Sequence, residues 1–381
     1  MNMGTLLEYL KWRADLRFSN DPFNDVDALI LSMLSYLPFK DIVPGVNEEE
    51  KITLEDTARA YFSEHPSHKD NPEIIGLTVS PSMDQELIKM LKMTSKSARY
   101  AEIRLSHFVE KTDSPVEQQF AAITYSLPHA KRHKVIAFRG TDRTLIGWKE
   151  NFELAYMKEV PAQESASTYL DCEINIVSGK VTVCGHSKGG NLAVYAASRM
   201  KGINQSRLSR IVNFDGPGFN FSILPRSYFS ECEQKVVNYV PEESIVGVLL
   251  DTVGERNVVS SSARHLFQHN PVTWGIERSG FLSGELSETT KLFEATVETW
   301  LSQLTLERRK AFIDALFDVM GASEGKTVDP KESLKEIGKV IKNVSDLDEE
   351  TRKMLSEVLA SIKDQALDTI SKAIREKLSL G

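Results

Sequence analysis

Residues 181–193 constrain the fold of this chain more than any other stretch, and they read VTVCGHSKGGNLA. Their β-branched start predicts a short buried strand, and the residues after the glycines predict a helix. Ser187 stands between the two, with Gly185 and Gly189 two residues away on either side. Because glycine has no Cβ, strand and helix can approach each other closely around a strained turn. The stretch therefore predicts a strand, a sharp turn that lifts the Ser187 hydroxyl clear of the sheet, and a helix.

A serine on such a turn is the arrangement of the nucleophile in α/β-hydrolases, and an ordinary strand-to-helix turn that contains a serine is the alternative. A serine hydroxyl is a poor nucleophile unless a base holds it and donors stabilise the oxyanion that its attack creates. The backbone N–H of Lys188, at the head of the helix, is expected to point toward that oxyanion. The rest of the chain would then supply a base, an acid and a second oxyanion donor.

Strand and helix signals alternate around this turn. They predict an α/β-hydrolase fold with a mostly parallel sheet and helices on both of its faces. Residues 120–127 and 134–138 are predicted to form a hairpin. The other predicted elements are helices near 146–158, 163–178 and 189–200 and strands at 210–214, 235–240 and 257–260.

The chain is predicted to have a mostly helical N-terminal region over 1–110 that packs on the core, a catalytic core over 111–284 and a helical C-terminal subdomain over 285–381. The C-terminal region carries apolar residues at helical spacing, which predicts packing on the core or, in a homodimer, on a second copy of the chain. An amphipathic surface that meets lipid is the alternative. In the N-terminal region, helices are expected at 25–36, 53–62 and 85–93.

Composition excludes several classes of protein. The net charge of -8 and the lack of a long basic stripe argue against a nucleic-acid partner. The 3 cysteines have no ligand-like spacing, so neither a disulfide framework nor a metal site is expected, and a reducing compartment fits. No stretch approaches the length of a membrane span, and the first residues lack the apolar region of a signal peptide. A cytoplasmic protein without a cofactor is therefore expected.

The order of the catalytic residues in this fold is serine, then acid, then histidine. Only two of the 8 histidines, His265 and His269, follow Ser187. His269 precedes Asn270 and Pro271, which suits an exposed loop at the end of a strand, so His269 is favoured as the base. His265 stays as the alternative base.

The acid has two candidate positions. Asp215 directly follows the strand predicted at 210–214 and precedes a Gly-Pro-Gly turn, so its carboxylate is well placed to orient a histidine. Glu242 and Glu243 follow the next predicted strand, which is the other location of the acid in this fold. An aspartate that only caps the Gly-Pro-Gly turn is the structural alternative for Asp215.

Three segments together resemble the class 3, fungal-type lipases: VIAFRGT at 135–141, WKENF at 148–152 and GHSKGG at 185–190. The resemblance implies that Thr141 is an oxyanion-hole residue together with Lys188, and that Trp148 lies on a lid-like helix. Trp148 and His186 are thus candidates for a lid or for substrate contact.

The whole chain more closely resembles a bacterial family of lipase-like α/β-hydrolases of largely unknown function. The segments that carry this resemblance are the opening LEYLKWR, the Ser187 motif, DGPGF at 215–219 and QHNP at 268–271. It implies that His269 is the base.

The chain departs from class 3 lipases at two positions. Ser244 stands where their aspartate would fall, and the turn at 213–219 resembles the acid-bearing turn of pancreatic-type lipases, which favours Asp215 as the acid. Lys188 replaces an aliphatic residue and opposes the helix dipole. It is expected either to contact an anionic acyl or head group or to form an internal ion pair with a nearby carboxylate such as Asp142 or Asp215.

These residues predict a serine hydrolase that cleaves a small-molecule or lipid-like carboxylic ester through an acyl-enzyme on Ser187. An acyltransferase that uses the same triad is an alternative, because an alcohol could intercept the acyl-enzyme in place of water. A non-catalytic binding protein that keeps the fold is a second alternative.

Overall fold

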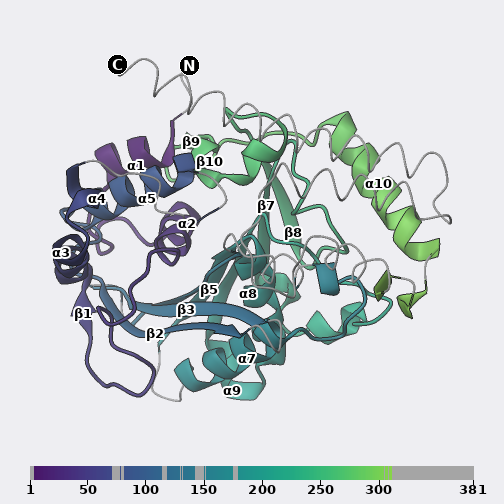
Figure 1. Cartoon of the computed structure of the whole chain (residues 1–381), viewed down its shortest axis with the longest axis horizontal. Coiled ribbons are helices and arrows are strands. Elements are labelled where there is room, and N and C mark those ends of the chain that lie inside the picture. The colour runs from purple at the N-terminus through teal and green to yellow at the C-terminus, as the bar shows by residue number, and fades with distance from the viewer. Residues whose placement is uncertain are drawn as a thin grey trace.

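The structure is a computed structural model of the chain, and it describes residues 4–70, 78, 81–113, 118–128, 130, 132–141, 150, 152–174, 179–303, 305–307 and 309–310. Its centre is a sheet of eight strands whose spatial order follows their order in the chain (Figure 1). These strands are β1 (Ile52–Thr53), β2 (Arg104–Asp113), β3 (Gln118–Ser126), β4 (Lys134–Phe138), β5 (Val181–His186), β6 (Leu208–Phe214), β7 (Val236–Pro241) and β8 (Glu255–Val259). A separate pair, β9 (Ile276–Glu277) and β10 (Gly280–Phe281), is antiparallel.

The sheet has an antiparallel half and a parallel half. Strands β1 to β4 pair antiparallel, and they include the predicted hairpin of β3 and β4. Strands β4 to β8 pair parallel, as the alternation of strands and helices predicts. Because parallel strands end at the same edge of a sheet, the residues that follow β5 and β6 come close together there.

Helices cover both faces of this sheet, which confirms the predicted α/β architecture. Successive side chains of a strand point to opposite faces. On β5, Cys184 therefore lies in the core formed with the N-terminal helices, whereas Val183 lies in the core formed with α7 and α8. The N-terminal helices are α1 (Leu6–Arg13), α2 (Asp25–Leu34), α3 (Leu54–Glu64), α4 (Ser67–Asp70) and α5 (Pro81–Thr94). The later helices are α7 (Pro161–Glu173), α8 (Lys188–Arg199), α9 (Gly202–Arg207) and α10 (Glu288–Gln303), with short 3₁₀ turns at Arg226–Phe229, Glu233–Lys235, His265–His269 and Pro271–Thr273.

The predicted N-terminal helices at 25–36, 53–62 and 85–93 correspond to α2, α3 and α5. Helix α2 packs against β4, β5 and β6, so the N-terminal region shares a core with the sheet. Strand β2 goes beyond the prediction, which has helices over most of this region. A register shift between Ser106 and Val109, with His107 at φ 54°, interrupts the alternation of apolar and polar residues that would indicate a strand.

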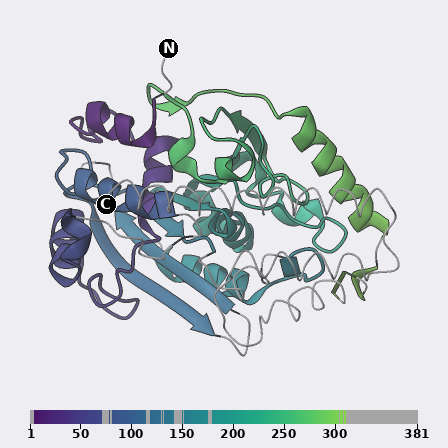
Figure 2. The same cartoon turned by 45° about the horizontal axis from the view of Figure 1, so that its top comes forward.

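Helix α10 lies on the side of the molecule away from α1 and α3, as two views show (Figures 1 and 2). It falls in the region predicted as a helical subdomain, and the remainder of that prediction, from residue 311 on, lies outside the described residues. The helix predicted near 146–158 is described only at residue 150 and from residue 152 on, where it ends at Glu153.

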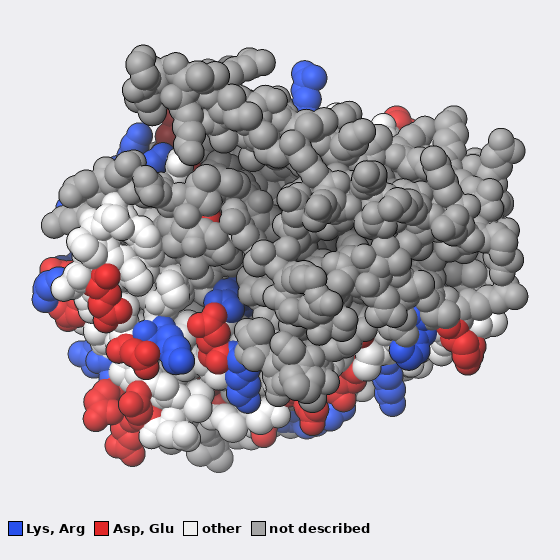
Figure 3. Space-filling model, in the orientation of Figure 1, with Lys and Arg blue, Asp and Glu red and all other residues white. Residues whose placement is uncertain are grey.

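Charges of both signs are mixed on the described surface in Figure 3. Lysine and arginine side chains lie there beside aspartate and glutamate side chains. Among the residues that the structure describes, no helix is long and apolar enough to cross a membrane.

Candidate active site

Ser187 occupies the sharp turn that the sequence predicts between β5 and α8. Its backbone has φ 58° and ψ -134°, a conformation that is strained for a residue with a side chain. A Cβ placed on Gly185 would lie 2.2 Å from the carbonyl carbon of Gly189, and a Cβ on Gly189 would lie 2.1 Å from the carbonyl oxygen of Phe138. Both glycines are therefore required by the close approach of strand and helix, which holds the strained turn.

His269 lies between Ser187 and Asp215. Its Nε2 atom is 3.1 Å from Ser187 Oγ, and its Nδ1 atom is 2.6 Å from Asp215 Oδ2. Asp215 is buried and directly follows β6, with its backbone at φ 51°. The protonated Nδ1 donates to the carboxylate, which leaves Nε2 free to accept the proton of the Ser187 hydroxyl. The fold thus joins the favoured nucleophile, base and acid in one chain of hydrogen bonds.

Two further donors hold the Asp215 carboxylate from the side opposite His269. The Ser244 hydroxyl donates to Oδ1 at 2.5 Å, and the backbone N–H of Gly247 donates to the same oxygen at 3.1 Å. By the resemblance to class 3 lipases, Ser244 stands where an aspartate was expected, and its contact with Asp215 was not predicted. The serine at that position supports the carboxylate of Asp215.

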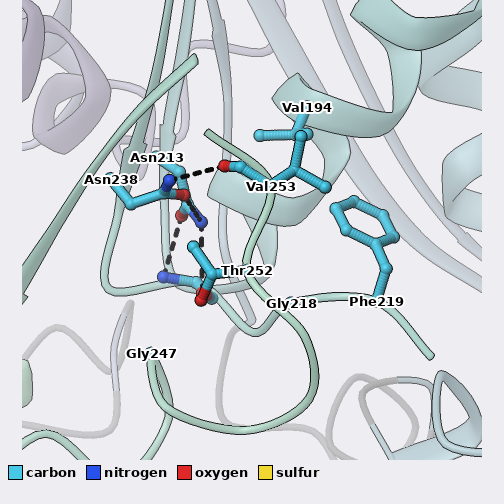
Figure 4. Close-up of a pocket in the computed structure, with 9 residues that line it drawn as sticks. Val194, Asn213, Gly218, Phe219, Asn238, Gly247, Thr252 and Val253 are labelled. Atoms are coloured by element: carbon cyan, nitrogen blue, oxygen red, sulfur yellow. Dashed lines mark hydrogen bonds between the residues drawn. The ribbon is translucent and has the colours of Figure 1, made fainter. Parts of the chain in front are cut away.

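The turn that carries Asp215 is fixed by two asparagines on neighbouring strands (Figure 4). Asn213 accepts the N–H of Gly216 at 2.9 Å and donates to Oδ1 of Asn238 at 3.0 Å. Asn238 donates in turn to the carbonyl of Val253 at 2.7 Å. Both asparagines line a small pocket next to this turn. Their hydrogen bonds satisfy backbone groups that the turn would otherwise bury without partners.

The alternative base and acids lie elsewhere. The His265 side chain is 66% exposed, and its Nδ1 atom is 3.3 Å from Oε2 of Glu243. Glu242 accepts a hydrogen bond from the Ser260 hydroxyl at 3.1 Å. Within the described part of the chain, no hydrogen bond joins these three side chains to Ser187, His269 or Asp215.

The Lys188 side chain runs into the protein. Its Nζ atom is 2.8 Å from Oε2 of Glu150 and 2.7 Å from the carbonyl oxygen of Gln119, and the lysine is 1% exposed. An internal ion pair was one of its two predicted roles, but the partner is Glu150 and not Asp215, while Asp142 lies outside the described residues. Because these bonds engage the ammonium group inside, the side chain does not reach a substrate. The N–H of Lys188, in the first turn of α8, has no acceptor within the helix and stays a candidate oxyanion donor.

The segment that contains Thr141 runs beside the Ser187 turn. A Cβ placed on Gly140 would lie 3.0 Å from the Cβ of Ser187 and 2.5 Å from the carbonyl oxygen of His186. Thr141 follows directly and is half-buried. Its role in an oxyanion hole stays a prediction, and Trp148 lies outside the described residues.

His186 takes a place inside the fold and not at a lid. Its ring is buried, with Nδ1 2.9 Å from the Tyr36 hydroxyl and Nε2 2.8 Å from the carbonyl oxygen of His269. Burial, with His269 nearby, holds the pKa of His186 well below the ordinary value, so the ring is neutral. Both nitrogens have partners within the protein, which leaves neither for a substrate. Nothing in the pattern of the N-terminal region indicates the part played by Tyr36.

The chain was compared with protein families, with curated proteins and with solved structures. The sequence model of the Mbeg1-like family matches residues 94–318. The crystal structure of M37 lipase is similar with a TM-score of 0.35 and 16% sequence identity over 58% of this chain and 68% of that one. No curated protein matches. No group of three or more histidines, cysteines or acidic residues is arranged to hold a metal ion in the described ranges. Because the family match spans more than half of its length, the chain belongs to the Mbeg1-like family.

Proposed function

We propose that this protein is a lipase-like serine hydrolase of the α/β-hydrolase fold that cleaves carboxylic esters. The observation that carries the proposal is the hydrogen-bonded chain from Ser187 through His269 to Asp215. Membership of the Mbeg1-like family, the strained Ser187 backbone and the parallel half of the sheet support it. The substrate class is a small-molecule or lipid-like ester.

In the first step, Ser187 Oγ attacks the ester carbonyl while His269 Nε2 accepts its proton. Asp215 keeps the proton of the imidazole on Nδ1 and stabilises the imidazolium that forms. The negative charge that develops on the carbonyl oxygen would be stabilised by the N–H of Lys188 and by Thr141, with each donor contributing about 3 kcal/mol. The tetrahedral intermediate then expels the alcohol, which takes the proton from His269, and leaves an acyl group on Ser187.

In the second step, water attacks the acyl-enzyme and gives its proton to His269. The acid leaves and Ser187 regains its proton, so the enzyme returns to its starting state. An alcohol in place of water would transfer the acyl group, since the same atoms and the same charges are involved.

Covalent labelling with a fluorophosphonate tests this proposal. The wild type is expected to be labelled and to hydrolyse short p-nitrophenyl esters, whereas Ser187→Ala removes labelling and lowers turnover by at least roughly a thousandfold. Ser198→Ala is a matched control because Ser198 is a buried serine of α8, the helix that follows Ser187, and its hydroxyl donates to the Tyr195 carbonyl at 2.7 Å.

Labelling that survives in Ser187→Ala but is lost in another serine variant would sink the proposal. A series of acyl-chain lengths would then define the substrate class. Adding a short alcohol and measuring the transferred ester would separate acyl transfer from hydrolysis.

A further inference from the structure

Tyr36 belongs to the N-terminal region but reaches the centre of the candidate site. It lies two residues beyond the end of α2, and its side chain is buried. Its hydroxyl is 2.9 Å from Nδ1 of His186, the residue that directly precedes the nucleophile. Tyr36 therefore contacts a residue 150 positions later in the chain, and that residue is the direct neighbour of Ser187.

The direction of the hydrogen bonds through His186 follows from the chemistry of its partners. The carbonyl oxygen of His269 can only accept, so His186 Nε2 carries the proton and donates to it. The neutral ring then has an unprotonated Nδ1, which accepts the hydrogen of the Tyr36 hydroxyl. The chain runs from the Tyr36 hydroxyl through the His186 ring to the backbone of His269, and it allows a single tautomer of His186.

His186 also contacts the ring of His269. The two ring centroids are 4.7 Å apart, with an angle of 36° between the ring planes. The hydrogen bond to the carbonyl oxygen of His269 restricts the backbone of that residue, and the ring contact restricts its side chain. A shift of His186 would therefore change the 3.1 Å distance between His269 Nε2 and Ser187 Oγ.

The Tyr36 hydroxyl meets a second part of the site at Gly140. A Cβ on that glycine would lie 2.1 Å from the phenolic oxygen, so the hydroxyl packs directly against the backbone that precedes Thr141. One phenol thus contacts the strand end that leads to Thr141 and, through His186, the base.

We propose that Tyr36 is a positioning residue, which acts through His186 to hold His269 in line with Ser187. This inference rests on the proposed function of the Ser187 site. Positioning of a base contributes to the rate of the chemical step and not to the binding of the ester, because the contacts of Tyr36 are with the protein.

The test compares Tyr36→Phe with Tyr125→Phe in the full chain. Tyr125 is a matched control: it is equally buried, and its hydroxyl bonds at 3.1 Å to the carbonyl of Leu31, which lies on α2. For a short p-nitrophenyl ester, Tyr36→Phe is expected to lower kcat roughly fivefold to tenfold with KM within about twofold, because one neutral hydrogen bond is lost. Tyr125→Phe is expected to keep kcat at comparable thermal stability. Equal kcat values for Tyr36→Phe and the wild type would overturn the inference, as would an equal fall in both variants.

Nitrogen-15 spectra of histidine-labelled wild-type protein provide a readout that does not depend on activity. His186 is expected as a neutral ring protonated at Nε2, and the Nδ1-protonated tautomer would overturn the inference even if Tyr36→Phe fails to fold. If the wild type neither hydrolyses esters nor reacts with a fluorophosphonate, the proposed function fails. The inference is then decided by the His269 ring signals, which Tyr36→Phe must shift and Tyr125→Phe must not.

Discussion

Asp215 is a buried carboxylate with partners on both of its oxygens. Oδ2 accepts from His269, and Oδ1 accepts from the Ser244 hydroxyl and the Gly247 N–H. A buried charge is costly unless it is hydrogen-bonded, and these bonds also leave the carboxylate a single orientation toward the imidazole. Ser244 therefore orients the Asp215 carboxylate without touching His269.

Under the proposed function, replacing Asp215 and removing the hydroxyl that supports it should have very different effects. Asp215→Asn is expected to lower kcat roughly ten-thousandfold because the amide favours the wrong tautomer of His269. Ser244→Ala is expected to lower kcat only about threefold to tenfold, since the Gly247 N–H still holds the carboxylate. Initial rates with a p-nitrophenyl ester measure both. A Ser244→Ala enzyme with wild-type kcat would show that the hydroxyl does not orient Asp215.

At the scale of elements, the first turn of α8 carries a charge that the helix dipole disfavours. Lys188 is buried at the positive end of the helix, and Glu150 compensates its charge. The Glu150 carboxylate also accepts the N–H of Ala162, in the first turn of α7, at 2.8 Å and the N–H of Gln119 on β3 at 3.2 Å. The ion pair thus ties α7, α8 and β3 together beside Ser187.

Breaking this pair should destabilise the protein strongly. Lys188→Met is expected to lower the free energy of unfolding by about 3–5 kcal/mol, because it leaves a buried carboxylate without its counter-charge. The double variant Lys188→Met/Glu150→Gln should lose less than the sum of the single variants, and urea unfolding of the four proteins gives their coupling.

The matched control for that experiment is Lys89→Met, which removes an exposed lysine 2.7 Å from Glu86 on α5. It should change the free energy of unfolding by less than about 1 kcal/mol. Similar small losses for Lys188→Met and Lys89→Met would contradict a structural role of the buried pair.

At the scale of the whole molecule, stability should depend on pH through buried neutral histidines. Burial, helped by Lys180, lowers the pKa of His133 to about 4, whereas a histidine in the unfolded chain titrates near 6.5. Between these two pH values the unfolded state binds more protons, so the free energy of unfolding rises with pH. The contribution of His133 is complete above about pH 6.5 and is lost as the pH falls toward 4.

His133→Gln is therefore expected to flatten the fall in stability between pH 6.5 and about 4. Denaturant unfolding of wild type and variant at several pH values measures the effect. Above pH 7 the two curves should run parallel, because both side chains are then neutral. Parallel curves over the lower range as well would show that His133 does not contribute.

The local sequence pattern was sufficient to predict much of the architecture. The β-branched run before Gly185 predicts β5, the residues after Gly189 predict α8, and the alternation of strands and helices predicts the parallel half of the sheet. Strand β2 was not predicted, because its bulge at His107 breaks the alternation of apolar and polar residues by which a strand is predicted.

For the candidate site, the sequence by itself determined the order of residues along the chain: a serine on a strained turn, an aspartate after the next strand and two late histidines. Only the tertiary structure decided that His269 and Asp215 lie in line with Ser187, that Lys188 pairs with Glu150 and that Tyr36 reaches His186. The physical reason is that periodicity and turn preferences report on neighbours along the chain, whereas hydrogen bonds between side chains depend on which strand ends and loops the fold brings together.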